Sequence, residues 1–119
     1  MKEDNVIVAK SKAFALRIIR LYQWLVNEKR EFVLSKQVLK SGTSIGANVK
    51  EGVRAQTKAD FTAKMSIALK EASETEYWLE LLNESDYIEN EHFESIYSDN
   101  KELIKLLMAI TKTAQKKEN

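Results

Sequence analysis

The residues whose types could support catalysis are few, and the first of them is a single histidine, His92. Glu89 lies three residues before it, and a Glu-x-x-His spacing supplies ligands in di-iron helical bundles. Such a site needs two of these motifs and two further inward glutamates, whereas this chain has one motif, near the predicted start of a helix. We therefore interpret His92 as a solvated residue close to a helix cap.

Other catalytic groupings are absent from the sequence. The chain has no cysteine, which excludes thiolate metal ligands and cysteine nucleophiles. It has no glycine-rich phosphate loop and no Ser/His/Asp grouping. Glu71, Glu74 and Glu76 resemble a carboxylate cluster, but Glu76 falls on a predicted outer face. We expect no enzymatic activity, no catalytic residue, no cofactor, no metal site and no small-molecule substrate.

Long helices must position whatever function remains. No proline occurs among the 119 residues, and 31% of the residues are charged, which favours uninterrupted helices. Apolar periodicity predicts four of them, over residues 4–28, 33–56, 57–84 and 90–115. Similar lengths and short connections favour antiparallel neighbours. The sequence predicts an all-α fold, with residues 1–119 forming a single domain built as an antiparallel up-down-up-down four-helix bundle.

The first predicted helix has more apolar surface than one core can cover. Phe14, Ile18 and Leu25 fall on one helical face, whereas Leu16 and Ile19 fall on a second. Because a single buried stripe cannot absorb both faces, we expect this helix to be covered on two sides. Association with another copy of the chain is one way to cover it.

All three glycines lie in the predicted second helix. Each interior glycine costs about 1 kcal/mol of helix propensity relative to alanine. Gly42 and Gly46, four residues apart, therefore predict close packing of another helix into a small-residue notch. The notch fits either the core of one chain or an interface between copies. Gly52, near the helix end, is interpreted as loosening the last turn.

Short polar residues flank the apolar line of the same helix. Ser44, Asn48 and Glu51 fall beside it, and Glu71 and Glu74 hold a similar position on the third helix. Since buried polar groups need partners, we hypothesise a polar layer in which Ser44 and Asn48 donate to Glu74 or Glu71. Its role would be to fix the register of the two helices.

The charges are unevenly distributed along a chain whose net charge is +1. Residues 1–60 carry 12 Lys and Arg against 6 Asp and Glu, whereas residues 61–119 carry 7 against 12. The basic half is either a surface for a polyanion or is neutralised by the acidic half, within one chain or across an interface. The candidate nucleic-acid contacts are Lys10, Arg17, Arg20, Lys36, Lys40, Lys50, Arg54 and Lys58.

Two blocks of sequence carry a family resemblance. The first is Ser44-Ile45-x-Ala47-Asn48-Val49-x-Glu51-Gly52; the second comprises Phe61, Ile67-Ala68-Leu69, Glu74-Thr75-Glu76-Tyr77-Trp78-Leu79 and Asp86-Tyr87-Ile88. Together they resemble the signature of four-helix-bundle proteins encoded in intervening sequences of bacterial 23S rRNA genes. The resemblance implies a ring-like homopentamer of antiparallel bundles. A related branch, the accessory protein of diversity-generating retroelements, works with a reverse transcriptase and binds nucleic acid.

The expected function is therefore that of a non-enzymatic scaffold or interaction module that assembles with further copies of itself, as a pentamer if the resemblance holds, and that acts on a protein or ribonucleoprotein partner. The alternative is an RNA-binding or other nucleic-acid-binding protein that uses the basic faces of the first two helices, in a ribonucleoprotein or reverse-transcriptase context. The apolar run at residues 6–9 is too short for a signal peptide, and no stretch is long enough to span a membrane. A cytoplasmic location is expected.

Overall fold

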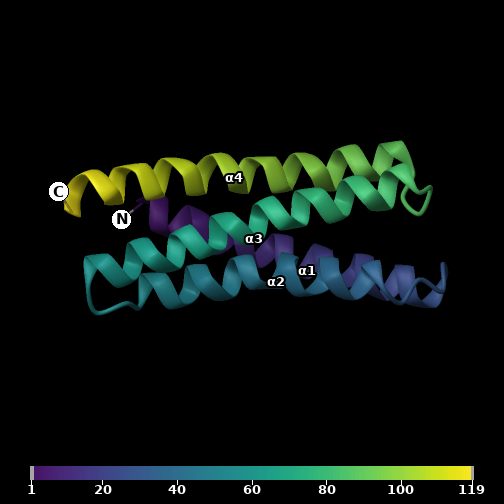
Figure 1. Cartoon of the computed structure of the whole chain (residues 1–119), viewed down its shortest axis with the longest axis horizontal. Helices are drawn as coiled ribbons and strands as arrows, with labels where there is room; N and C mark the ends of the chain where they lie inside the picture. The colour runs from purple at the N-terminus through teal and green to yellow at the C-terminus, as the bar shows by residue number, and fades with distance from the viewer. Residues whose placement is uncertain (1, 119) are drawn as a thin grey trace.

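The computed structural model describes residues 2–118, which form four helices in a rod 47 Å long and about 20 Å across. The helices are α1 (Lys2–Asn27), α2 (Leu34–Val53), α3 (Lys58–Glu84) and α4 (Asn90–Glu118). Each runs antiparallel to the one before it, and the two chain ends lie at the same end of the rod (Figure 1). The molecule is an all-α, up-down-up-down four-helix bundle, as the sequence predicts, and residues 2–118 contain no strand.

The helices are arranged in chain order around the bundle. α2 packs against α1 and α3, α3 packs against α4, and the sparser contact between α4 and α1 closes the circle. The core is made by apolar residues at helical spacing on all four helices. Its fully buried members include Ile7, Ile18, Leu25, Val38, Ile45, Val49, Met65, Leu79, Leu82, Leu103 and Leu107.

Local signals set where the helices begin. Thr57 caps α3, its hydroxyl accepting from the backbone N–H of Asp60 at 3.0 Å. The start of α2 depends on Glu31, which sequence reasoning missed. Its carboxylate accepts from the backbone N–H of Val33, Leu34 and Ser35 at 3.2, 3.1 and 2.7 Å. Both contacts satisfy amide groups that a helix start leaves without partners.

The two-faced pattern of α1 has a direct structural counterpart. Phe14, Ile18 and Leu25 are buried in the core, whereas Leu16 and Ile19 are 49% and 37% exposed. The bundle therefore covers one apolar face of α1 and leaves the other in water. None of the four helices, within the part of the chain that is described, is long and apolar enough to cross a membrane.

Candidate functional site

The glycine notch lies between α2 and α1 of the same chain. A Cβ added at Gly42 would lie 2.8 Å from two side-chain carbons of Ile18, and one at Gly46 would lie 3.3 Å from the backbone oxygen of Ser11. Both distances are shorter than ordinary van der Waals contact. The glycines thus let α1 approach α2 closely. Of the two placements that the sequence left open, the core of one chain and an interface between copies, the notch lies in the core of one chain.

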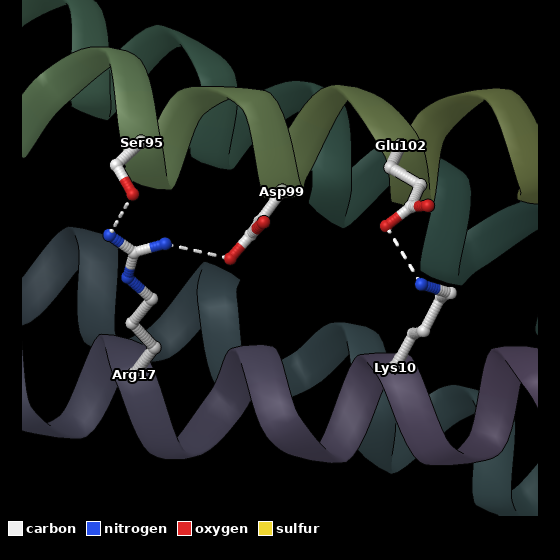
Figure 2. Close-up of polar contacts among 5 residues, drawn as sticks. All are labelled: Lys10, Arg17, Ser95, Asp99 and Glu102. Atoms are coloured by element: carbon white, nitrogen blue, oxygen red, sulfur yellow. Dashed lines mark hydrogen bonds and ion pairs between the residues drawn. The ribbon is translucent and has the colours of Figure 1, made fainter.

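Two of the candidate nucleic-acid contacts are engaged within the bundle. Arg17 donates to Asp99 Oδ2 and to Ser95 Oγ, each at 2.7 Å. Lys10 Nζ donates to Glu102 Oε1 at 3.1 Å. Figure 2 shows these side chains reaching from α1 to α4 along one edge of the bundle. Part of the basic half is therefore neutralised by the acidic half within one chain.

The basic residues of α2 have a different setting. Lys36, Lys40, Lys50 and Arg54 are exposed, and no ion pair joins them to an acidic side chain within residues 6–117. Arg20 and Lys58 are exposed as well. On α2 the spacing of four, ten and four residues keeps all four cations on one side of the helix. Such a row can follow a phosphate backbone, a contact that gives affinity without reading sequence.

A shallow hollow of about 580 Å³ lies where α2 passes into α3. Its walls carry charges of both signs, and the ion pair between Lys64 Nζ and Glu51 Oε1, at 3.0 Å, joins the two helices there. The lining residues are Ala47, Lys50, Glu51, Arg54, Ala55, Asp60 and Lys64. The mixture of charges does not select an anion or a cation.

The hydrogen bonds predicted for a polar layer between α2 and α3 are not the ones that Ser44 and Asn48 form. Ser44 Oγ donates to the carbonyl of Lys40 at 2.6 Å, and Asn48 Nδ2 donates to the carbonyl of Ser44 at 2.8 Å. Both side chains are half-buried at the edge of the α2–α3 contact, where Ser and Asn can bond to the preceding turn of their own helix. Neither hydrogen-bonds to Glu71 or Glu74.

The glutamates of that hypothesis have separate environments. Glu51 pairs with Lys64, and Glu74 accepts from Trp78 Nε1 at 3.3 Å. Partial burial, and then repulsion from Glu74, raise the pKa of Glu71 above its ordinary value. The carboxylates of Glu71 and Glu74 therefore border the α2–α3 contact as like charges.

The buried polar contacts between helices involve residues that the sequence analysis did not single out. Thr75 Oγ1 donates to Ser41 Oγ at 2.9 Å, which joins α3 to α2. Asn100 is fully buried, and its Nδ2 donates to the carbonyl of Ala72 at 3.0 Å. Asn100 lies in the apolar line of α4, between Ile96 and Leu103. A polar residue at a core position of a helix is the feature of the sequence from which this buried hydrogen bond could have been predicted.

The residues considered for catalysis do not lie together in one site. His92 is exposed in the first turn of α4. Across the described side chains, no group of three or more His, Asp or Glu residues is arranged to hold a metal ion. Exposed apolar residues are a further feature of the surface, among them Leu16 and Ile19 on the outward face of α1.

Comparison with known proteins places the chain in a family. The model of the 23S rRNA-intervening sequence protein family matches residues 3–109. The chain belongs to this family. A crystal structure at 1.70 Å of a protein of unknown function from Bacteroides thetaiotaomicron, described as of the S23 ribosomal protein family, is similar: it is 59% identical, with a TM-score of 0.91, over 92% of this chain and 98% of that one. No curated protein matches the chain.

The match confirms the resemblance drawn from the two sequence blocks. In this member of the 23S rRNA-intervening sequence protein family, the first block lies on α2 and includes the half-buried Ser44 and Asn48. Gly42 precedes the block and Gly46 takes one of its unspecified positions, so the close contact with α1 lies beside the block residues. The second block lies on α3 except for Asp86-Tyr87-Ile88, which falls in the connection to α4. The family description names no enzymatic activity, and the solved relative is described as a protein of unknown function.

Proposed function

We propose that this family member is a non-enzymatic scaffold or interaction module that works as a homo-oligomer. The observation that carries the proposal is the outward apolar face of α1, where Leu16 and Ile19 are 49% and 37% exposed. Exposed apolar surface of this kind marks a site of association. A second copy of the chain would remove it from water, whereas none of the four described helices covers it.

Five copies in a ring is the assembly that the family resemblance implies. Native mass spectrometry and light scattering at micromolar concentration test it. We expect one dominant species at five times 13.7 kDa. A monomer across the accessible concentration range would overturn the proposal. A smaller or larger closed assembly would keep the scaffold and correct its stoichiometry.

Nucleic-acid binding is a second candidate, supported by the row of cations on α2. Lys36, Lys40, Lys50 and Arg54 are exposed and have no ion-pair partner among the described side chains. Repetition of this row in an assembly would multiply a modest patch. The context would be a ribonucleoprotein or a reverse-transcriptase complex. Cytoplasmic placement is part of the same proposal.

Electrophoretic mobility of labelled RNA at low and moderate salt tests this candidate. Binding through phosphates should weaken steeply as salt rises. Replacing Lys36, Lys40, Lys50 and Arg54 by glutamine should abolish the shift, whereas the matched replacement of Lys101, Lys105, Lys112 and Lys116, all exposed on α4, should not. If RNA mobility is unchanged by the wild-type protein at low salt, the nucleic-acid function is excluded and the scaffold remains.

A further inference from the structure

The outward face of α1 is apolar and cationic. Leu16 and Ile19 are exposed on it, and Lys12 and Arg20 are exposed beside them. Residues 5–27 contain four cations and no acid. The other two cations of this segment are paired with α4, so Lys12 and Arg20 are the ones left on the outward face. No acidic side chain within residues 6–117 forms an ion pair with either.

The outward face of α3 is apolar and anionic. Ile67 and Tyr77 are 41% and 54% exposed, and Glu74 is exposed between them. Lys70 is exposed one turn after Ile67, but from Glu71 to Glu84 the helix carries five glutamates and no base. Neither Glu71 nor Glu74 forms an ion pair among the described side chains. The two faces therefore share an apolar character and differ in the sign of their charge.

The two faces also point in different directions. α1 and α3 each pack against α2 and α4, and the backbones of α1 and α3 do not lie side by side in the described residues. They occupy opposite corners of the bundle, so the outward face of α1 cannot reach α3 of its own chain. Only another copy can bring the two faces together.

We propose that the outward face of α1 in one copy docks on the outward face of α3 in the next. This inference rests on the proposed self-association and names the surfaces that form it. Leu16 and Ile19 would pack near Ile67 and Tyr77, with Arg20 facing the glutamates. The segment from Lys12 to Arg20 spans about 12 Å and that from Ile67 to Trp78 about 16 Å, a match to within one helical turn.

The charges argue against pairing of like faces. Two α1 faces brought together would place a wholly cationic segment against its own copy, and two α3 faces would do the same with glutamates. Like charges across an interface are costly, whereas opposite charges favour docking. An interface between two different faces is heterologous, and such interfaces build rings or open filaments. The head-to-tail arrangement is therefore compatible with a closed ring.

Cysteine cross-linking tests which faces meet, because the chain has no cysteine of its own. The double variant Leu16→Cys/Ile67→Cys should form a ladder of covalent multimers on mild oxidation, and each single variant should form none. Met108→Cys, exposed on α4, is the matched control and should stay uncross-linked. Covalent dimers of Leu16→Cys alone would show that like faces meet and would overturn the inference.

A charge exchange gives a second, independent test. Arg20→Glu and Glu74→Arg should each raise the midpoint concentration of assembly roughly tenfold or more. The two changes on one chain restore opposite charges at every head-to-tail interface, so the double variant should recover assembly. Lys105→Glu, an exposed charge reversal on α4, is the control. Circular dichroism checks that each variant is folded.

The outcomes separate this inference from the proposed function. A wild-type monomer would defeat both. An intact assembly whose charge-exchange variant fails to recover, or whose Leu16→Cys variant links to itself, would defeat only the head-to-tail arrangement.

Discussion

α1 meets its two neighbours by different means. Against α2, the glycines remove side chains and the helices approach until a Cβ at Gly42 would lie 2.8 Å from Ile18. Against α4 the contact is sparser, and it is bridged at the surface by Arg17–Asp99 at 2.7 Å and Lys10–Glu102 at 3.1 Å. One contact depends on shape and the other, at its edge, on charge.

The difference teaches where the stability of the bundle resides. Close packing excludes water and tolerates little added volume, whereas exposed ion pairs contribute only about 0–1 kcal/mol. The α1–α4 contact is therefore the one that opens at lower cost. The two ion pairs between α1 and α4 therefore add little stability. Their main effect is to fix which acidic residues of α4 lie beside Arg17 and Lys10.

The largest effect is expected from filling the glycine notch. Gly42→Leu should lower the free energy of unfolding by about 3 kcal/mol, the upper range for overpacking, because Ile18 is fully buried and branched at the contact. Denaturant unfolding followed by circular dichroism measures it. Ala47→Leu adds a comparable side chain to an exposed position of α2 and should change stability little. Equal losses in the two variants would refute the close approach.

A smaller substitution sharpens the same point. Gly42→Ala should destabilise by about 1 kcal/mol, because the strain of overpacking exceeds the helix propensity gained. Gly52→Ala is the matched change. A Cβ added there would lie 3.1 Å from the flexible end of Met65 and 3.2 Å from Lys64 Cβ, looser contacts than the two at 2.8 Å at Gly42, so Gly52→Ala should cost less stability than Gly42→Ala. The comparison fails if thermal melts rank the two variants in the opposite order.

Loss of an ion pair between α1 and α4 should change the free energy of unfolding only slightly. A double-mutant cycle with Arg17→Ala and Asp99→Ala should give a coupling energy of about 0.5 kcal/mol. Added salt should reduce this coupling, whereas the cost of Gly42→Leu should persist. A coupling as large as the glycine effect, or one insensitive to salt, would contradict the contrast drawn between the two contacts.

The smallest effect concerns the α2–α3 edge, where Glu74 lies near Glu71 and its repulsion is only partly offset by Lys40 and Lys70. Desolvation, and then Glu74, raise the pKa of Glu71 above 4.5, so the folded state binds its proton more readily than the unfolded chain does. The resulting stability is full below pH 4.5 and is lost as pH rises through the raised pKa. Glu71→Gln should therefore be slightly more stable than wild type at pH 7.

The pH dependence of that advantage is the check. The difference in unfolding free energy between Glu71→Gln and wild type should shrink as pH falls towards 4.5. Glu94→Gln, at an exposed position on α4, is the control. An advantage that is constant with pH would mean that the ionisation of Glu71 is not its source.

The sequence by itself determined the helices and the residues that face the core. Absence of proline and an apolar period near 3.6 are local properties of the sequence. They were sufficient to place Phe14, Ile18 and Leu25 in the core and to show that Leu16 and Ile19 lie on a second face, outside that core. The two blocks of sequence were also sufficient for the family.

Only the tertiary structure decided which surfaces meet. Whether Gly42 faces α1 or another chain, and whether Arg17 is available or paired with Asp99, depends on the rotation of helices that are distant in sequence. Ser44 and Asn48 lie on the predicted side of α2, yet they bond to their own helix. A periodic pattern fixes the angle of a side chain around its helix, but the partner at that angle is set by the packing of the whole bundle.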